Sequence, residues 1–425
     1  MCAESKVAAG AGRMAATAPV GKVSRVGLLG HGTVGGAFAR LLADRSEQIE
    51  RRLGHPVVIG GVLTRSRGDF DQILSECEVI VELIGGLEPA RSYALAALAA
   101  GRGFVSANKQ LLCEHGEELF SAARQSGAQI RFEAAVAGVI PVIRVLQESL
   151  ACDRLERVHG IVNGTTNYIL TAMAAGRSYE QALAEAKQEG FAEADPSEDI
   201  SGKDAAAKMA IIARLAFGVP VRLSEVPHEG IEHLQSDDLL YARELGLSLK
   251  LIGTAERTEG GISVRVHPAF LYSGHPLAAV SGPYNALTIE SEAITEITMS
   301  GPGAGGIQTA SAVLGDLCSV LTLPSPPPPE PLALPLIEDF PSAFYLHVEV
   351  ADRPGVLAAV AGALGAHGVS LKSVLQRGLG ENARLVMVTH RIARSRLEAA
   401  LAAVSELEHV RSRPRAIPVI EEEFR

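Results

Sequence analysis

The segment from Gly190 to Lys208, GFAEADPSEDISGKDAAAK, concentrates side chains that are suited to acid–base chemistry. It carries seven ionisable side chains in nineteen residues: Glu193, Asp195, Glu198, Asp199, Lys203, Asp204 and Lys208. Asp204 and Lys208 are four residues apart in an expected helix, so both side chains leave the same face. A carboxylate-rich loop that leads into such a helix could hold a small amino acid and transfer one proton.

The alternative is a solvated surface pair, which would add about 0.3–0.5 kcal/mol to helix stability. The helix continues, however, as MAIIARLAF, which is mostly apolar and is therefore expected to be buried. A buried carboxylate and a buried lysine need partners or a function. We therefore interpret Asp204 and Lys208 as candidate catalytic residues.

A glycine-rich turn near the N-terminus predicts a nucleotide site. Residues 24–29, SRVGLL, are expected to form a short buried strand that runs into GHGTVGG (residues 30–36) and then a helical pattern. A GxGxxG motif between a strand and a helix is typical of dinucleotide binding. Gly30 permits the tight turn, Gly32 lets the backbone approach a pyrophosphate, and Gly35 lets helix and strand pack closely. The alternative is a glycine-rich turn without function.

The residues after the second expected strand bear on the choice of dinucleotide. Residues 57–63, VVIGGVL, form that strand, and NAD-specific sites place an acidic residue at its end to hold the ribose hydroxyls. Here the strand ends in LTRSR, which contains Arg65 and Arg67. An arginine pair suits a 2′-phosphate, so the sequence favours NADP. NAD remains an alternative, because two exposed arginines are also ordinary surface residues.

Two further candidates follow or lie in later expected strands. Lys109 comes after GFVSAN (residues 103–108), and at the carboxyl edge of a parallel sheet it would point into the ligand crevice. It could hold a cofactor phosphate or a substrate carboxylate, or be a surface lysine. Glu133 lies in an apolar strand expected over residues 130–135 and needs a partner, either a metal ion or a nearby lysine.

Two loops in the middle of the chain could contact a ligand. Residues 163–166, NGTT, include Thr165 and follow a helix expected over residues 142–150 and a strand expected over residues 157–162. Their hydroxyls, amides and N–H groups could bind a small polar ligand or simply cap a helix. Residues 300–306, SGPGAGG, precede a helix expected over residues 309–318. Such a loop can close over a nicotinamide or a phosphate, or be a flexible turn.

Length and composition limit the class of protein. With 425 residues, 47% of them hydrophobic, the chain is expected to hold two or three domains. The net charge of −10 argues against a nucleic-acid partner, because phosphate binding needs a basic stripe. Five scattered cysteines indicate a reducing compartment and no structural zinc. Without an apolar run of about 20 residues or a secretion signal, we expect a cytoplasmic protein that has no membrane contact.

The C-terminal part follows a proline-rich linker. Residues 321–339, LTLPSPPPPEPLALPLIED, are expected to be stiff and extended. Beyond them the pattern predicts strand, helix, strand, strand, helix, strand, which is a ferredoxin-like arrangement. The segment ADRPGVLAAVAGALGAHGVSL (residues 351–371) resembles the ACT domain, a module that senses amino acids. N–H groups at its DRPG turn could meet an amino-acid carboxylate. A purely structural dimerisation domain is the alternative.

The chain also resembles one enzyme family from about Val23 to about Leu321. GLLGHGTVGG, SANK, EAAVAGVIP, NGTTNYIL, GFAEADPSEDISGKDAAAK and GPGAGG, in this order and spacing, are similar to homoserine dehydrogenases. The long GFAEADP…DAAAK stretch is far more specific than the GxGxxG motif. The resemblance implies interconversion of L-aspartate 4-semialdehyde and L-homoserine with NAD(P)H, on the route to threonine and methionine. With the ACT-like module, it implies a homodimer or homotetramer inhibited by threonine.

The resemblance implies a role for each candidate residue. Lys208 matches the family's proton donor, and Asp204 and Lys109 match residues that assist at the substrate oxygen. The implied substrate contacts are Glu193 and Asp199, which would hold the amino group. Thr165, in the NGTT loop, is a further candidate substrate contact. The cofactor contacts that the resemblance implies are His31, Thr33, Val34, Ser106, Gly190 and Gly303. The other candidate cofactor contacts, taken from the motifs above, are Gly30, Gly32, Gly35, Arg65 and Lys109. The implied site for sodium or another monovalent cation consists of Glu133 and the carbonyls of Val136, Gly138 and Ile140. His31 departs from the family, which often has an aliphatic residue there.

The expected fold is α/β. It comprises a disordered tail (residues 1–22), a Rossmann-type parallel sheet (23–150, completed by 306–321), an inserted α+β substrate and dimerisation domain (151–305), a linker (322–341) and a ferredoxin-like ACT domain (342–425). Two other functions are considered. A phosphorylating semialdehyde dehydrogenase would need a thiolate nucleophile, for which Cys113 and Cys152 are the mid-chain candidates. A non-catalytic sensor of NADP and amino acids would not need Asp204 and Lys208.

Overall fold

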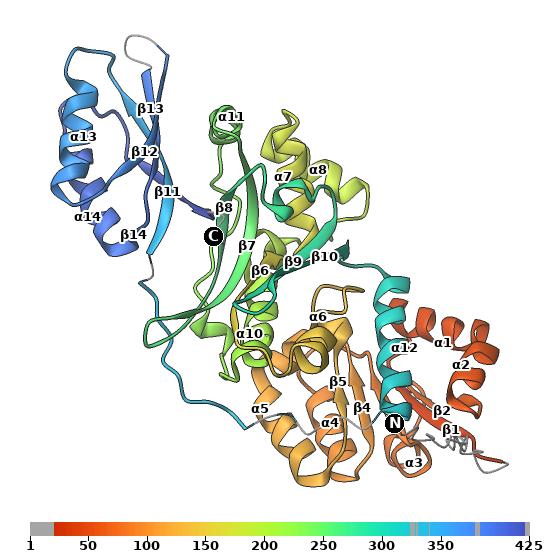
Figure 1. Ribbon diagram of the computed structural model, residues 1–425. Coiled ribbons are helices and arrows are strands. Elements are labelled where there is room, and N and C mark those ends of the chain that lie inside the picture. The colour runs from red at the N-terminus through yellow and green to blue at the C-terminus, as the bar shows by residue number, and fades with distance from the viewer. Residues whose placement is uncertain (1–20, 324–327, 329, 340, 379–382, 421–425) are drawn as a thin grey trace, which may run out of the picture.

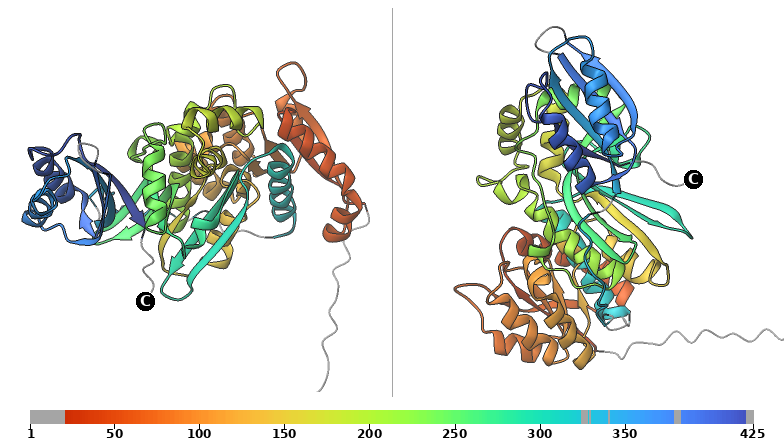
Figure 2. Two further views of the ribbon diagram at one scale, coloured as in Figure 1. Left: turned by 90° about the horizontal axis from the view of Figure 1, so that it is seen from above. Right: turned by 90° about the vertical axis from the view of Figure 1, so that its left-hand side faces the viewer.

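The computed structural model describes residues 21–323, 328, 330–339, 341–378 and 383–420 (Figure 1). The tail expected over residues 1–22 therefore lies almost entirely outside the described residues, and the linker is described only in part. Figure 2 shows an elongated molecule in which the N-terminal part, a central part and the C-terminal part follow one another. No helix within the described ranges has the length and apolar character needed to cross a membrane.

The N-terminal part is built on a parallel sheet of five strands in the order β2-β1-β3-β4-β5. The strands are β1 (Ser24–Leu29), β2 (Val57–Leu63), β3 (Val79–Glu82), β4 (Gly103–Ser106) and β5 (Ile130–Arg131). The connecting helices are α1 (Thr33–Asp44), α2 (Ser46–Leu53), α3 (Phe70–Glu76), α4 (Ala90–Ala99) and α5 (Lys109–Ser126). Because β2 and β3 lie on opposite sides of β1, the carboxyl ends of β1 and β3 border the crevice where such sheets bind ligands. The Rossmann-type sheet is therefore confirmed.

A helix from the far end of the central part completes this core. α12 (Gly306–Thr322) lies beside α1 in Figure 1. Its side chains Val313 and Leu317 are buried in the same hydrophobic cluster as Val26 and Leu28 of β1. The chain thus returns to the N-terminal part after the central part, because α12 shares a hydrophobic core with β1 and α1.

The structure corrects three local expectations. The strand expected over residues 130–135 ends at Arg131 and continues as a 3-10 turn over Glu133–Ala135, because the Glu133 carboxylate accepts hydrogen bonds from the start of the next helix. That helix, expected over 142–150, is α6 (Val142–Arg144) followed by a π-helix, η2 (Val145–Ser149). The glycine-rich loop is shorter than expected, since residues 300–302 close β10 and α12 already begins at Gly306.

The central part packs helices on an antiparallel sheet in the order β10-β9-β6-β7-β8. The strands are β6 (Leu155–Ile161), β7 (Leu247–Thr258), β8 (Gly261–Tyr272), β9 (Tyr284–Ser291) and β10 (Thr295–Pro302). The helices are α7 (Gly164–Ala174), α8 (Tyr179–Gln188), α9 (Ser197–Ile200), α10 (Lys203–Phe217) and α11 (Ser236–Glu244). α10 lies against β7 and β8 and also against α5, so it joins the central part to the N-terminal part.

The C-terminal part has the expected βαββαβ order. Its elements are β11 (Pro341–Val350), α13 (Val356–Ala366), β12 (Leu371–Arg377), β13 (Ala383–Thr389), α14 (Arg394–Ser405) and β15 (Arg415–Ile420), with a two-residue strand β14 (Ile392–Ala393) before α14. The strand order β15-β11-β13-β12 is ferredoxin-like. β15 also pairs in parallel with β8, so the sheets of the central and C-terminal parts are continuous. This pairing was not expected from the sequence.

Candidate active site

Two helices bring three ionisable side chains together. The Nζ atom of Lys109, at the start of α5, lies 2.6 Å from Oδ1 of Asp204 on α10. The Nζ atom of Lys208, one turn further along α10, lies 2.7 Å from Oδ2 of the same carboxylate. The Asp204 side chain is 5% exposed, against 32% for Lys109 and 13% for Lys208. One buried carboxylate therefore holds two ammonium groups that still reach the surface.

Local sequence explains why these side chains stand at helix starts. α10 begins after Gly202, whose φ of +82° suits glycine, and its apolar side chains are buried along its length. This places Asp204 in the first turn, where the helix dipole favours a negative charge. α5 begins at Lys109 because the Asn108 side chain caps it by accepting a hydrogen bond from the Leu111 N–H group.

The charges of the cluster stabilise one another. Burial would raise the pKa of Asp204, but the ammonium groups of Lys208 and Lys109 hold it well below its ordinary value. Burial would likewise lower the pKa of Lys109, but the Asp204 carboxylate raises it above its ordinary value. Asp204 and Lys109 are therefore both ionised at neutral pH.

Asn163 links this cluster to a second carboxylate. Its Nδ2 atom donates hydrogen bonds to Oδ1 of Asp199, at 2.7 Å, and to Oδ2 of Asp204, at 2.9 Å. Its Oδ1 atom accepts from the Thr166 N–H group and so caps α7. The sequence left a ligand site and a helix cap as alternatives for the NGTT loop, and the structure shows the cap, while Asn163 itself was not named as a site residue. Its position between two carboxylates depends on tertiary structure.

The predicted substrate-binding residues are only partly brought together. Asp199 is half-buried beside the cluster, and burial, with the nearby charge of Asp204, raises its pKa. The Thr165 hydroxyl donates to the carbonyl oxygen of Phe191 at 2.7 Å, which ties the start of α7 to the loop before α9. Glu193 lies on that same loop but is exposed and stays outside the hydrogen-bonded cluster.

Lys208 is held in place by a second hydrogen bond. Its Nζ atom donates to the carbonyl oxygen of Val162, at the end of β6, at 2.7 Å as well as to Asp204. An ammonium group has three N–H donors, so one remains for a ligand. The two bonds fix the direction in which this donor points.

The glycines of the first turn fall into two kinds. A Cβ atom at Gly30 would lie 2.5 Å from the Leu83 carbonyl oxygen, and one at Gly35 would lie 2.1 Å from the Gly30 carbonyl oxygen. These two positions need glycine for packing within the protein. A Cβ atom at Gly32 would meet no atom of the described residues within 4 Å. α1 has no side-chain cap at Gly32 and no acidic residue in its first turn, which fits a phosphate group there.

The other predicted cofactor residues are spread over several elements. His31, Thr33 and Arg65 are exposed, and Val34 is half-buried. Gly306, which begins α12, is close enough that its Cβ atom would lie 2.9 Å from Cγ2 of Thr33, so the starts of α1 and α12 adjoin. Gly303 precedes α12, whereas Gly190 is exposed at the end of α8 with a φ of +77°.

Ser106 is engaged within the protein. Its side chain is buried, and its hydroxyl group donates to Oε2 of Glu82 at 2.7 Å and accepts from the Asn108 N–H group. Glu82, at the end of β3, is itself fully buried and also accepts from the N–H groups of Ile84 and Gly85. Apart from its place in an apolar strand, nothing in the sequence indicated this role for Glu82.

The predicted cation site contains only oxygen donors. The Glu133 carboxylate is buried and accepts from the N–H groups of Ile143, at 2.8 Å, and Arg144, at 3.0 Å. Burial and the neighbouring Asp316 raise the pKa of Glu133 to about 7, and burial raises the pKa of Asp316 to about 6. Among the described residues no group of three His, Cys, Asp or Glu side chains gathers. A cation would thus depend on backbone carbonyls.

The donor set fits a hard monovalent cation. Arg144 pairs with Asp316 at 3.2 Å, so one guanidinium group faces two buried carboxyl groups. A cation beside Glu133 would lower the cost of ionising both. Gly138, whose φ is +65°, packs so closely on Gly303 that its Cβ atom would lie 2.5 Å from the Gly303 carbonyl oxygen. The predicted cation loop and the predicted cofactor loop therefore touch.

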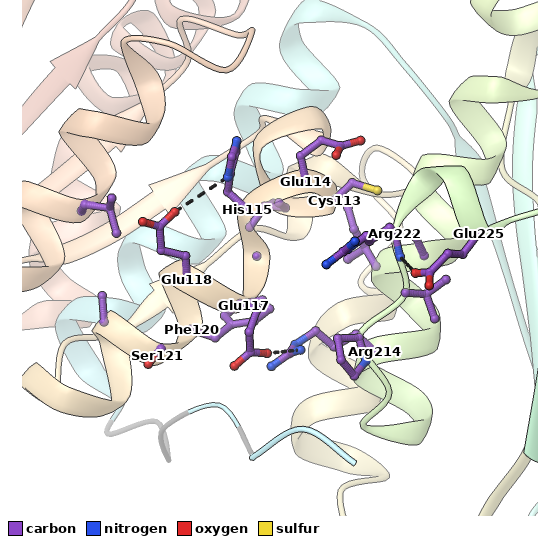
Figure 3. Close-up of a pocket in the computed structure, with 18 of the residues that line it drawn as sticks. Cys113, Glu114, His115, Glu117, Glu118, Phe120, Ser121, Arg214, Arg222 and Glu225 are labelled. Atoms are coloured by element: carbon purple, nitrogen blue, oxygen red, sulfur yellow. Dashed lines mark hydrogen bonds and ion pairs between the residues drawn. The ribbon is translucent and has the colours of Figure 1, made fainter. Parts of the chain in front are cut away.

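A separate cavity of about 890 Å³ lies further along α5 and α10 (Figure 3). Two of the carboxylates drawn there pair with basic side chains: Glu117 with Arg214 and Glu118 with His115. Cys113 lines the cavity, and burial raises the pKa of its thiol to about 11. A thiol with so high a pKa does not supply the thiolate that a phosphorylating semialdehyde dehydrogenase needs. Cys152 is exposed after η2, away from this cavity.

Comparison with known proteins shows the family to which the chain is related. The sequence model of homoserine dehydrogenase matches residues 141–318, that of the homoserine dehydrogenase NAD binding domain matches residues 30–133, and that of the ACT domain matches residues 344–409. The homoserine dehydrogenase of Pseudomonas aeruginosa is 39% identical over 421 residues, which cover 92% of this chain and 97% of that protein. The chain belongs to the homoserine dehydrogenase family.

Further relatives extend the similarity. The homoserine dehydrogenase of Bacillus subtilis is 37% identical over 419 residues, covering 92% of this chain and 96% of that protein. The crystal structure of a homoserine dehydrogenase from Thiobacillus denitrificans superposes with a TM-score of 0.87 at 36% identity, over 94% of this chain and 99% of that one. A hyperthermophilic archaeal homoserine dehydrogenase in complex with NADPH gives a TM-score of 0.62 at 27% identity, over 72% of this chain and 100% of that one.

Family membership decides between the functions that the sequence left open. The protein is an NAD(P)-dependent oxidoreductase of amino-acid biosynthesis with homoserine dehydrogenase activity, an NAD-binding domain and a C-terminal ACT domain. The phosphorylating semialdehyde dehydrogenase and the non-catalytic sensor are therefore set aside.

Proposed function

We propose that this homoserine dehydrogenase reduces L-aspartate 4-semialdehyde to L-homoserine with NADPH, and that Lys208 is the proton donor. The observation that carries the proposal is the contact of the Lys208 and Lys109 ammonium groups with the two oxygens of Asp204. When bound, the cofactor supplies a hydride to the aldehyde carbon. The aldehyde oxygen then gains negative charge, which a nearby ammonium group stabilises before it donates a proton.

Asp204 and Lys109 assist this proton transfer. Asp204 orients Lys208 and balances its charge, while the Val162 carbonyl fixes the direction of the ammonium group. Lys109 adds a second positive charge on the other oxygen of the same carboxylate. In the oxidation of homoserine, Lys208 accepts the proton instead.

Asp199 and Glu193 are proposed to hold the amino group of the substrate, and Thr165 is proposed as a further substrate contact. The raised pKa of Asp199, caused first by its burial, favours an ammonium group beside it, because the added positive charge would offset that burial. Thr165 holds the loop before α9 through Phe191. Glu193, now exposed on that loop, would join the site when the loop folds over the substrate.

The cofactor is proposed to lie across the carboxyl edge of the parallel sheet. The uncapped start of α1 at Gly32 suits the pyrophosphate, and Arg65 suits a 2′-phosphate because β2 ends without a carboxylate. Support for NADP also comes from the archaeal relative that was solved with NADPH. The remaining proposed cofactor contacts are Gly30, His31, Thr33, Val34, Gly35, Ser106, Lys109, Gly190 and Gly303.

A sodium ion is proposed at Glu133 and the carbonyls of Val136, Gly138 and Ile140. Its charge would neutralise Glu133 and hold the loop that touches Gly303, and no chemical step passes through it. Replacing choline chloride by sodium chloride at constant ionic strength should raise the melting temperature of the wild-type protein. The Glu133→Gln variant should lose this difference. An equal response of both proteins would remove Glu133 from the site.

The remaining assignments are those of domains, assembly and regulation. We propose a cofactor domain over residues 23–150 completed by 306–321, a substrate and dimerisation domain over 151–305, a linker over 322–341 and a regulatory domain over 342–425. The protein is proposed to form a homodimer or homotetramer. Threonine is proposed to bind at the DRPG turn before α13 and to inhibit the enzyme.

One assay tests the central proposal. Absorbance at the NADPH band is followed with L-aspartate 4-semialdehyde and NADPH, and in reverse with L-homoserine and NADP. NADH and NAD are compared at equal concentrations. We expect turnover in both directions with a lower KM for the phosphorylated cofactor. Absence of turnover with the purified full-length chain would contradict the proposed reaction.

A further inference from the structure

Lys250 is a buried lysine that the proposed mechanism does not use. It lies on β7, and only 5% of its surface is exposed. Its Nζ atom donates to the carbonyl oxygen of Val280 at 2.5 Å and to Oδ1 of Asn167 at 3.3 Å. Both acceptors are neutral. Burial lowers the pKa of Lys250 to about 8, and no charged neighbour among the described residues offsets this effect.

The setting of Lys250 differs from that of the two active-site lysines. Lys109 and Lys208 share the Asp204 carboxylate, whereas Lys250 is more buried and has amide and carbonyl oxygens in place of a carboxylate. The charged form of a lysine is destabilised when burial removes the water around its ammonium group and no anion replaces that water. A negative group from outside this chain would correct the imbalance.

The space for such a group is present. A pocket of about 290 Å³ opens beside Lys250, between α7, α11, the start of β7 and the 3-10 helix η4 (Pro276–Ala279). Lys250 and Arg243 contribute its two cations, and Thr171, Ser248 and Ser281 contribute three hydroxyl groups. Leucines and alanines form the rest of its wall, and the described residues that line it include neither Asp nor Glu.

We propose that this pocket binds a small carboxylate anion with a short aliphatic chain, held by Lys250 and Arg243. The two cations and the hydroxyl groups suit the carboxylate, and the leucine and alanine wall suits the chain. An amino acid fits less well, because the lining offers no carboxylate for its ammonium group. The volume is at the lower end of ligand pockets, which limits the ligand to a few carbon atoms.

The pocket is separate from the candidate active site but shares a helix with it. The last turns of α7 line the pocket through Thr171 and Ala174, whereas the first turn carries Thr165 next to the cap residue Asn163. At 1.5 Å per residue along the helix, Thr171 lies about 9 Å and Ala174 about 14 Å from Thr165. α11, which lines the pocket through Arg243, also carries Asp238, whose partner His347 belongs to the C-terminal part.

Direct binding tests the proposal without any turnover. Propionate is titrated into the full-length protein by isothermal calorimetry, and propionamide, which has the same shape without the charge, is the matched ligand control. We expect propionate to bind and propionamide not to bind. Lys250→Met should weaken propionate binding at least ~10-fold, while Lys22→Met, which removes a lysine that precedes β1 in the N-terminal part, should leave it unchanged. Equal binding of both ligands, or unchanged binding by Lys250→Met, would overturn the proposal.

Two further measurements test whether the anion binds in this pocket. Ala278→Leu fills the pocket and keeps Lys250, so it should abolish propionate binding; retained binding would place the anion elsewhere. Methylated lysines can be followed by NMR, with the Lys250 signal assigned by its loss in Lys250→Arg. Propionate should raise the pKa of this group. The pKa of Lys250 could already lie above the ordinary value without propionate and fall when the protein is diluted. That result would show that a second subunit fills the pocket instead of a small anion.

Discussion

The ammonium group of Lys109 lies 2.6 Å from the carboxylate of Asp204, although the two residues begin different helices in different parts of the molecule. α5 belongs to the parallel-sheet part, and α10 packs on the antiparallel sheet. The ion pair therefore joins the two parts at the place where the cofactor and the substrate are proposed to meet. Relative movement of the parts would separate Lys109 from the pair that Asp204 makes with Lys208.

Lys208→Ala should lower kcat at least ~100-fold, because it removes the proposed general acid. The affinity for NADPH, measured by equilibrium binding, should change little. Lys203→Ala is the matched control, since Lys203 lies on the same helix but is exposed and pairs with Glu198. Near-normal turnover by Lys208→Ala would show that another group donates the proton.

Asp204→Asn should destabilise the protein in a pH-dependent way. Loss of the partner of a buried charge costs about 3–5 kcal/mol. The pKa of Asp204 is lowered in the folded state. Its contribution to the free energy of unfolding is therefore complete above its pKa in the unfolded state, about 4, and is lost as the pH falls through its pKa in the folded state. The pKa of Lys109 is raised in the folded state. Its contribution to the free energy of unfolding therefore persists to alkaline pH and is lost as the pH rises through the pKa of Lys109 in the folded state.

The difference in melting temperature between wild type and Asp204→Asn should therefore be constant from about pH 5 to about pH 8 and shrink below about pH 4. Circular dichroism is the suitable probe, because the chain has no Trp. A difference that grew on acidification would contradict the assignment of charges.

Gly32→Ala and Gly35→Ala should have opposite signatures. A Cβ atom at Gly35 would lie 2.1 Å from a backbone oxygen, so Gly35→Ala should lower the melting temperature of the free protein. A Cβ atom at Gly32 would have open space around it, so Gly32→Ala should keep the stability and raise the KM for NADPH, because the backbone no longer approaches the pyrophosphate. If Gly32→Ala left this KM unchanged, the proposed position of the cofactor would be wrong.

Arg65→Ala should raise the KM for NADPH and leave the KM for NADH nearly unchanged, because only NADPH carries the 2′-phosphate. The loss of one arginine–phosphate contact is expected to raise the KM about 10-fold. Arg52→Ala, an exposed arginine on α2, is the control. A parallel rise of both KM values would place Arg65 elsewhere on the cofactor or outside the site.

Asp238→Asn should weaken the junction with the C-terminal part. The Asp238 carboxylate is buried, lies 2.8 Å from Nδ1 of His347 on β11 and 3.0 Å from Nη2 of Arg415 on β15, and its pKa is lowered by these partners against the effect of burial. The substitution leaves Arg415 without this carboxylate and should lower the melting temperature by several degrees.

Asp237→Asn is the matched control for this junction. Asp237 is the preceding residue, has a side chain that is 46% exposed and pairs with Arg384 at 3.0 Å, so its loss should cost less than about 1 kcal/mol. If threonine acts through α11, Asp238→Asn should also reduce threonine inhibition more than Asp237→Asn does. Equal inhibition in both variants would exclude Asp238 from this coupling.

Several features follow from local sequence. The strand–GxGxxG–helix order produced the β1–α1 turn because glycine is needed where backbones approach closely, as at Gly30 and Gly35. The four-residue spacing of Asp204 and Lys208 predicted their contact, since one helical turn brings such side chains together. The βαββαβ pattern of the last part likewise depends on hydrophobic periodicity, which is read along the chain.

Other features were decided only when distant segments met. The contact of Lys109 with Asp204, the place of Asn163 between two carboxylates and the pairing of β15 with β8 join residues far apart in the sequence. β5 ends before Glu133, because the Glu133 carboxylate accepts a hydrogen bond from the Ile143 N–H group at the start of the next helix. Periodicity and spacing describe one element at a time, whereas burial and charge pairing depend on which elements pack together, and that is why the environment of Lys250 was visible only in three dimensions.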